Sequence, residues 1–191
     1  HYRDGQFNNL HPTQMMTSDE GRFGAMLSFL FRKTENLRPE NEVPVIKTDL
    51  HKLGRDENVL IWFGHSSYFI QVDGKRFLVD PVFCMASPVS FVNKPFKGTD
   101  VYKPEDMPDI DYLVISHMEP DHAGSIAALC ACQPQVKLVA NAKTFVMLDQ
   151  FTGEHPLAQE RITVGEGGTL ALGSHTLHFV LAPMVHWPEV M

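Results

Sequence analysis

The fold is decided by the stretch Ser116-His117-Met118-Glu119-Pro120-Asp121-His122-Ala123-Gly124. It follows the apolar run Asp111-Tyr-Leu-Val-Ile-Ser116, which predicts a strand that is buried on both faces. Four potential metal ligands then occur within six residues. Because open α/β sheets bind ligands at the carboxyl ends of their strands, we expect these side chains to turn toward one point. Unpaired buried charges are costly and a bound metal offsets that cost, so the stretch predicts a metal site.

A further donor lies close to the end of the sequence. His186 follows a predicted strand at residues 176–181, in Pro183-Met-Val-His186-Trp-Pro188, where the two prolines restrict the turn. Taken alone, His186 is equally consistent with a surface histidine. Beside the first four donors, we expect it to supply an additional imidazole.

Around the metal stretch, short strands alternate with helices. Asp73-Gly74 between two apolar runs is typical of a type I′ hairpin turn, which needs positive φ at both central residues. Gly173-Ser174 predicts a second tight hairpin, and Gly153 a helix end. The sequence predicts strands at 59–63, 68–72, 76–79, 111–116, 136–140, 161–164, 169–172 and 176–181, and helices at 125–132 and 142–150. We therefore expect an α/β fold with a mixed sheet.

The pattern divides the chain into two parts. Residues 1–57 predict an irregular N-terminal extension with one helix near 19–32, and residues 58–191 predict the metal-binding domain. The loop at 80–109 is long for a structureless connection, which indicates a functional loop. The first residue is His1 and the last, Met191, falls inside a recognisable motif, so we expect truncation at both ends.

Composition excludes several classes of function. The net charge of −7 argues against a nucleic-acid partner, which would need a basic face. Three sparse cysteines do not form a disulfide framework and fit reduced thiols in the cytoplasm. The longest apolar run, 23–31, is too short to span a membrane. We expect no functional site at the remaining histidines and glycine-rich turns, or at the helix cysteines, namely His155, His175, His178, Cys130, Cys132 and Gly165–Gly168.

The order of a buried strand, the motif His-x-Glu-x-Asp-His and a later histidine at a strand end resembles the metallo-β-lactamase superfamily. This resemblance implies an αββα sandwich, of which we expect this chain to hold only the N-terminal part, with the domain incomplete at its C-terminus. Asp80, which follows the strand at 76–79, matches the early aspartate of that superfamily. It would support the metal loop, although a turn-capping aspartate is equally consistent with the sequence.

Within the superfamily, residues 118–191 resemble the flavodiiron proteins, which reduce dioxygen or nitric oxide at a di-iron centre. The resemblance rests on Glu119 between His117 and Asp121, and on Pro183-Met-Val-His186-Trp-Pro188. It implies that His117, Glu119 and His186 hold one metal ion, and that Asp121 and His122 hold the second. Added carboxylates favour iron over zinc. FMN and its electron-donor domain would be separate from this chain, and a bridging Asp and a final His would follow Met191.

Residues 7–117 resemble instead the N-acyl-phosphatidylethanolamine phospholipase D-like hydrolases. The segments that resemble them are Trp62-Phe-Gly-His65-Ser-Ser67, Asp73-Gly-Lys-Arg76, Leu78-Val-Asp80-Pro-Val-Phe83, Ala86-Ser-Pro88 and Pro108-Asp-Ile-Asp-Tyr-Leu-Val-Ile-Ser-His117. That resemblance implies a zinc hydrolase in which Asp121 is catalytic, because it orients the attacking hydroxide or accepts its proton. His65 would border the active site as a support or a substrate contact, or would be an ordinary loop histidine.

Three interpretations of function remain open from the sequence. The first is a flavodiiron-like dinuclear site that acts on a small molecule, the second is a zinc hydrolase, and the third is an inactive fragment or chimera joined near residue 117. The middle glutamate favours the first, and the loop around His65 favours the second. We expect the chain alone to turn over neither class of substrate efficiently. An uncovered apolar face would favour a homodimer.

Overall fold

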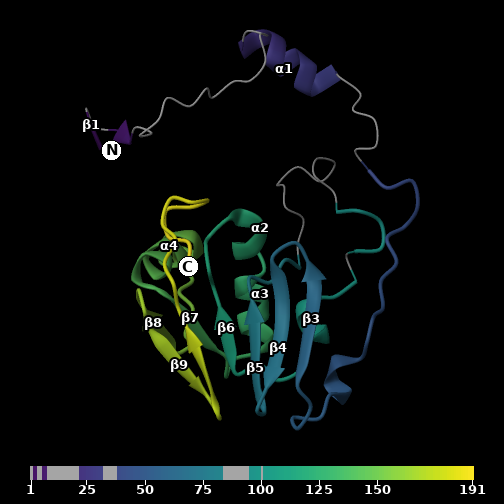
Figure 1. Ribbon diagram of the computed structural model, residues 1–191, viewed down its shortest axis with the longest axis vertical. Helices are drawn as coiled ribbons and strands as arrows, with labels where there is room; N and C mark the ends of the chain where they lie inside the picture. The colour runs from purple at the N-terminus through teal and green to yellow at the C-terminus, as the bar shows by residue number, and fades with distance from the viewer. Residues whose placement is uncertain (1, 4–5, 8–21, 32–37, 84–94, 100) are drawn as a thin grey trace. The chain divides into compact units, whose positions relative to one another are not determined.

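The structure, a computed structural model, describes residues 2–3, 6–7, 22–31, 38–83, 95–99 and 101–191 (Figure 1). The chain forms two compact units, His1–Pro39 and Glu40–Met191. The first contains the antiparallel strands β1 (Tyr2–Arg3) and β2 (Gln6–Phe7) and helix α1 (Arg22–Phe31). Helix α1 lies within the predicted 19–32. Cys84, the segment 86–88 and much of the predicted loop 80–109 lie outside the described residues.

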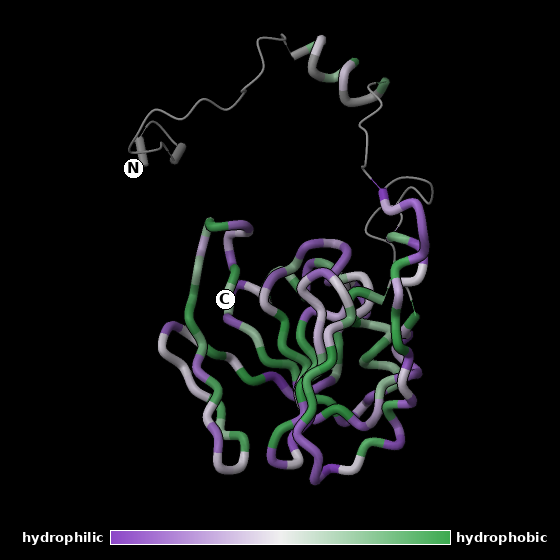
Figure 2. Tube along the Cα trace, turned by 45° about the vertical axis from the view of Figure 1, so that its right-hand side comes forward, coloured by the Kyte–Doolittle hydropathy of each residue, from purple (hydrophilic) through white to green (hydrophobic). Residues whose placement is uncertain are grey.

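The second unit is built on a mixed sheet, as the sequence predicts, and this sheet has six strands. Its first three strands are antiparallel, and from the third strand onward neighbours run parallel. In spatial order the strands are β3 (Val59–Gly64), β4 (Ser67–Val72), β5 (Lys75–Val79), β6 (Tyr112–Val114), β7 (Lys137–Asn141) and β8 (Arg161–Val164). Figure 2 shows that the strands of this sheet are mostly hydrophobic.

Tight turns set the antiparallel part of the sheet. Asp73 and Gly74 have φ of 48° and 71°, so both central residues of the β4–β5 turn adopt the positive φ that the Asp-Gly pair predicts. The hairpin pairs Val72 with Lys75 and continues to Tyr68 opposite Val79. This register places Asp80 immediately beyond the end of β5.

Helices cover one face of the sheet (Figure 1). They are α2 (Pro120–Ala123), α3 (Ile126–Cys132) and α4 (Ala142–Thr152), with two 3₁₀ turns, η1 (Leu50–Lys52) and η2 (Pro104–Asp106). Leu129 and Leu148 are completely buried against strand residues such as Leu78, Leu113 and Leu138. The sequence predicts α3 and α4, and Gly153, with φ of 57°, follows α4 as predicted. The single turn of α2 was expected to be a loop.

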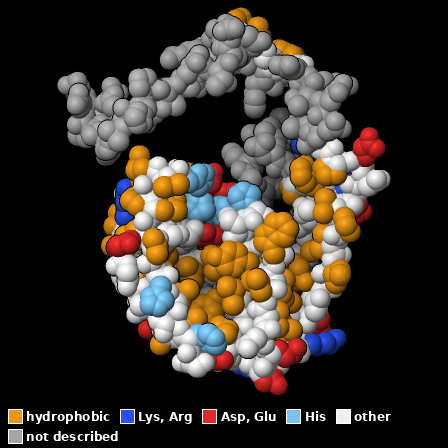
Figure 3. Space-filling model, viewed as in Figure 1, with side chains coloured by type: hydrophobic (Ala, Val, Ile, Leu, Met, Phe, Trp, Pro, Cys, Tyr) orange, Lys and Arg blue, Asp and Glu red, His pale blue; other side chains and the backbone are white. Residues whose placement is uncertain are grey.

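The opposite face of the sheet is covered over a smaller area. The hairpin of β9 (Thr169–Leu172) and β10 (His175–His178) forms a separate two-stranded sheet. Leu172 of β9 and Phe179, which follows β10, pack with strand residues such as Phe77 and Val139. Figure 3 shows an apolar area on this face over the first strands of the sheet. There Leu60 and Trp62 of β3 remain 70% and 71% exposed.

The last segment, 179–191, returns to the end of β6. Strand β10 ends at His178, earlier than the predicted 176–181, and the backbone N–H of Met191 donates to the carbonyl of Ser116 at 3.2 Å. Ala182 and Val190 are joined by a backbone hydrogen bond of 2.9 Å, which closes the loop that carries His186. In the described part of the chain, no helix is long and apolar enough to cross a membrane.

Candidate metal centre

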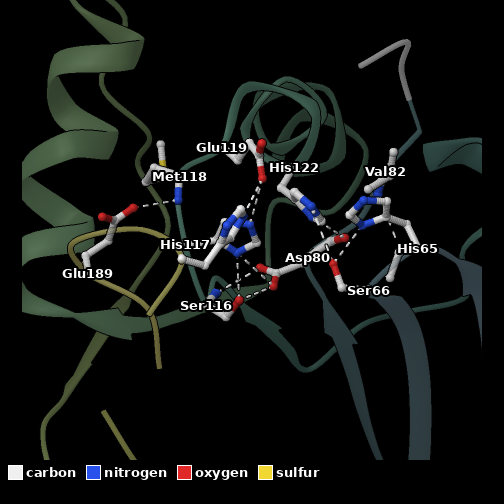
Figure 4. Close-up of polar contacts among 12 residues, drawn as sticks. His65, Ser66, Asp80, Val82, Ser116, His117, Met118, Glu119, His122 and Glu189 are labelled. Carbon is white, nitrogen blue, oxygen red and sulfur yellow. Dashed lines mark hydrogen bonds and ion pairs between the residues drawn. The ribbon is translucent and has the colours of Figure 1, made fainter. Parts of the chain in front are cut away.

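The predicted metal stretch lies at the carboxyl end of β6, between a buried strand and the helical face (Figure 4). Its backbone leaves the sheet after Ile115, whose N–H still donates to the carbonyl of Val139 at 2.9 Å. Pro120 then begins α2, because its fixed φ suits the first helical position. The N–H groups of His122 and Ala123 both donate to the carbonyl of Glu119. This turn brings the side chains of the motif together.

One group of potential ligands consists of His117, Glu119 and His122. One donor atom from each lies within 4.8 Å of the others. His117 and His122 are buried, at 6% and 1% exposure, and their ring centroids are 4.4 Å apart. The distance from Nε2 of His117 to Oε2 of Glu119 is 3.5 Å. Two imidazoles and a carboxylate at this spacing are a ligand set that zinc and iron accept.

His186 reaches the same group through Glu119. Its Nε2 lies 2.8 Å from Oε2 of Glu119, and its ring centroid is 5.4 Å from that of His117. The side chain is 57% exposed, so it closes the outer side of the group. The C-terminal loop therefore brings His186 beside Glu119, but His186 lies outside the set of mutually close donor atoms.

A second group consists of His65, Asp121 and His122, again with one donor atom from each within 4.8 Å of the others. Asp121 and His122 are buried and His65 is exposed. The sequence expects Asp121 and His122 to belong to one metal ion. It expects His65 only as a neighbouring support or substrate contact. The turn between β3 and β4 brings His65 to the motif, and its ring centroid is 5.1 Å from that of His122.

Asp80 connects the two buried histidines. Its Oδ1 accepts the N–H of Ser116 at 2.8 Å, its Oδ2 accepts the hydroxyl of Ser116, and Oδ2 lies 3.5 Å from Nδ1 of His117. The carbonyl of Asp80 is 3.3 Å from Nδ1 of His122. Asp80 is 3% exposed and has a φ of 41°, so the chain holds it in a strained conformation beneath the metal stretch.

The surroundings shift the protonation of these groups in different directions. The carboxylate of Asp80, by its hydrogen bond, raises the pKa of His117 despite burial. Burial lowers the pKa of His122. This effect is larger than that of the carboxylates of Asp121 and Asp80, which act to raise it. The hydrogen bond from His186 lowers the pKa of Glu119. The site therefore favours an ionised Glu119, which is the form that binds metal.

The sequence did not single out two residues that support the site. Glu189 is 3% exposed, and its Oε1 accepts the N–H of Met118 at 2.9 Å. Its backbone carbonyl accepts the side-chain N–H of Asn141. Ser66 places its hydroxyl 3.1 Å from Nδ1 of His65 and 3.4 Å from Nε2 of His122. A carboxylate three residues after His186 was the only signal in the sequence that could have pointed to Glu189.

A cavity of about 780 Å³ opens beside the second group of donors. Asp121 and His65 are part of its lining, and most of the other lining residues are apolar. Its walls come from the segment before η1, from β3, and from the loop before η2, and include Val45, Ile46, Ile61, Phe63, Phe96 and Tyr102.

Over part of its length, the chain is similar in sequence to proteins that are named as a nitric oxide reductase and a flavo-diiron protein. The chain is 32% identical over 131 residues to a nitric oxide reductase of Moorella thermoacetica, covering 66% of this chain and 29% of the relative. It is 36% identical over 87 residues to a flavo-diiron protein of Clostridium acetobutylicum, covering 45% and 21%. A solved structure, rubredoxin oxygen:oxidoreductase from Desulfovibrio gigas, matches with 28% identity and a TM-score of 0.48, covering 65% and 28%. The chain thus spans less than a third of the length of these proteins.

The family itself is shown by a match over more than half of the chain. The profile of the family described as Beta-lactamase superfamily domain matches residues 75–190. The matched region runs from β5 through the metal stretch and the hairpin of β9 and β10 to the loop that carries His186. The mixed sheet with helices on one face has the architecture expected of this fold. The chain therefore belongs to the family of beta-lactamase superfamily domains.

Proposed function

We propose that this domain binds two metal ions, iron in preference to zinc, in a flavodiiron-like site that serves the reduction of dioxygen or nitric oxide. The observation that carries the proposal is the convergence of His117, Glu119 and His122, with donor atoms within 4.8 Å of one another and both imidazoles buried. The relation to a nitric oxide reductase and to a flavo-diiron protein supports the choice of reaction.

The ligand chemistry fits iron. Glu119 stands where zinc hydrolases of this fold would use a third histidine, and carboxylate oxygen is a harder ligand than imidazole. His117, Glu119 and His186 would hold the first ion, and Asp121 and His122 the second. When bound, the pair of iron ions would supply electrons to a small gaseous substrate.

The protein's part in this site is to orient its histidines. The hydroxyl of Ser116 donates to Asp80 and lies 2.9 Å from Nδ1 of His117, which assigns the proton of His117 to Nδ1. Nδ1 of His122 faces the carbonyl of Asp80 in the same way. Both rings then present Nε2 to the carboxylates of the motif, because Nε2 of His122 lies 3.7 Å from Asp121. Asp80 therefore acts as the positioning residue for both imidazoles.

Electrons would come from a partner. The flavodiiron resemblance implies FMN on a separate domain or protein, and we propose an electron-donor flavin protein as the partner of this site. We expect the reaction in the cytoplasm, where the thiols of Cys130 and Cys132 stay reduced.

The experiment compares the metal preference of the wild-type chain with that of the variant Glu119→His. Both proteins are loaded anaerobically with an equimolar mixture of Fe(II) and Zn(II), and the bound metals are measured after desalting. We expect the wild-type chain to retain the higher iron-to-zinc ratio and Glu119→His to shift toward zinc, because imidazole is the softer ligand. Glu154→His, at an exposed glutamate in the turn after α4, is the control and should match the wild type. An equal ratio in all three proteins would refute the role of Glu119.

A zinc-dependent hydrolase is the second candidate, and the cavity favours it. A space of about 780 Å³ is far larger than a diatomic gas needs, and Asp121 is part of its lining. In this alternative Asp121 is the catalytic residue, which would accept a proton from the attacking water. Hydrolysis of an apolar phosphodiester by the zinc-loaded wild-type chain, with loss of this activity in Asp121→Asn, would favour the hydrolase. Activity that is equal in both proteins would exclude this role of Asp121.

A further inference from the structure

We propose that His65 is a ligand of the second metal ion, together with Asp121 and His122. The inference rests on the proposed dinuclear site and assigns to it a residue that precedes the metal stretch by more than 50 positions. It also explains why the turn between the first two strands of the sheet has an unusual backbone.

The backbone of this turn is strained at His65. β3 and β4 lose their regular register between Trp62 and Gly64, and Gly64 has a φ of 97°. His65 has a φ of 50°, in the left-handed region that residues other than glycine, asparagine and aspartate seldom adopt. The indole N–H of Trp62 donates to the carbonyl of His65 at 2.8 Å and holds the turn in this form. Such strain is typical of functional sites.

The strained turn aims the imidazole of His65 at the motif (Figure 4). One nitrogen of His65, one carboxylate oxygen of Asp121 and one nitrogen of His122 lie within 4.8 Å of one another. The hydroxyl of Ser66 lies between the two rings, 3.1 Å from His65 and 3.4 Å from His122. Three donors at this spacing are near enough to one another that small side-chain shifts would let them bind one ion.

The chemistry of the group suits a transition-metal ion. Asp121 and His122 are two of the ligands that the flavodiiron resemblance implies for this ion, and zinc and non-haem iron accept imidazole beside a carboxylate. His65 would add a further imidazole to them. Because His65 is exposed and lines the cavity, the open position of this ion would face the cavity. A substrate contact, the other role for His65, needs no such convergence with buried Asp121 and His122.

The test uses Co(II) alone, with the intact chain under anaerobic conditions. Bound cobalt is counted by equilibrium dialysis, and its ligand-field absorption bands report the coordination of each ion. The variants are His65→Asn and His65→Asp, since both residues tolerate the positive φ of the turn but only aspartate offers a charged ligand. His155→Asn, at an exposed loop histidine, is the matched control.

We expect the wild type and His155→Asn to bind two cobalt ions. His65→Asn should keep the first ion and bind the second about 10-fold to 100-fold more weakly, with loss of its absorption bands. His65→Asp should recover part of that affinity. Two ions with unchanged affinity and spectrum in His65→Asn would overturn the role of His65 and leave the proposed dinuclear site standing. Fewer than two ions in the wild type would overturn the dinuclear site itself, and the role of His65 with it.

Discussion

Asp80 contacts both buried histidines of the metal stretch. Its carboxylate supports Ser116 and His117, while its backbone carbonyl faces His122. A carboxylate behind a metal-binding imidazole fixes the ring and raises its basicity, which agrees with the raised pKa of His117. The resemblance to the metallo-β-lactamase superfamily implied a supporting role for Asp80, beside the alternative of a turn-capping aspartate. Its second contact, to His122, depends on the fold and was not predicted.

We predict that Asp80→Asn weakens metal binding by roughly 10-fold to 100-fold without unfolding the chain. Asparagine tolerates the φ of 41° and keeps the shape, but it removes the negative charge that faces His117. Isothermal titration with Co(II) measures the affinity, and thermal melting followed by circular dichroism checks the fold. Asp56→Asn, at an exposed aspartate before β3, serves as the control. Wild-type affinity in Asp80→Asn would contradict the positioning role.

At the scale of elements, one carboxylate links the two hairpins. Asp73, in the β4–β5 turn, accepts the N–H of Ser174 at 2.9 Å and the hydroxyl of the same residue, and it lies 2.9 Å from Nδ1 of His175. These contacts, led by the hydroxyl of Ser174, lower the pKa of Asp73 to about 2. They join the β9–β10 hairpin to the β4–β5 turn of the main sheet.

This link should depend on pH in a definite direction. Because the pKa of Asp73 is lowered in the folded chain, its ionised form stabilises the fold above the usual value of 3.8, and that contribution is lost as the pH falls toward about 2. We predict that Asp73→Asn lowers the free energy of unfolding at about pH 5, and that this difference shrinks at about pH 3. Urea titrations at the two pH values measure it, with the exposed carboxylate change Glu154→Gln as control. A difference that is equal at both pH values would refute the link.

The sequence predicted the elements well where local signals are strong. The Asp73-Gly74 turn and the alternating runs gave the antiparallel strands, and Gly153 gave the end of α4. Helix α2 was missed because it is a single turn made largely of ligands, with no apolar periodicity to reveal it. The approach of His65 to Asp121 was not predictable, since it depends on how the β3–β4 turn and α2 meet in space.

At the scale of the whole second unit, the sheet is covered unevenly. Helices bury one face, whereas the β9–β10 hairpin covers the other mainly over β5 to β8. Leu60 and Trp62 project from β3, which is an edge strand. An exposed apolar patch on an edge strand favours association between copies of a chain.

We predict that the purified chain self-associates through this face. Leu60→Lys should weaken association by about 2 kcal/mol, or roughly 30-fold in dissociation constant, because it puts a charge on the edge strand in place of a leucine that association would bury. Sedimentation equilibrium measures the association. Val146→Lys, which changes a 58% exposed valine on α4, should leave it unchanged. A wild-type chain that stays monomeric at high concentration would be incompatible with this prediction.

The central claim is that the motif and its neighbours hold two metal ions. The most direct measurement is anomalous X-ray diffraction at the iron absorption edge from crystals of the iron-loaded chain. We expect two anomalous peaks, one beside His117 and Glu119 and one beside Asp121 and His122. Iron-loaded crystals with no peak at either position, or with iron bound only elsewhere on the chain, would contradict it.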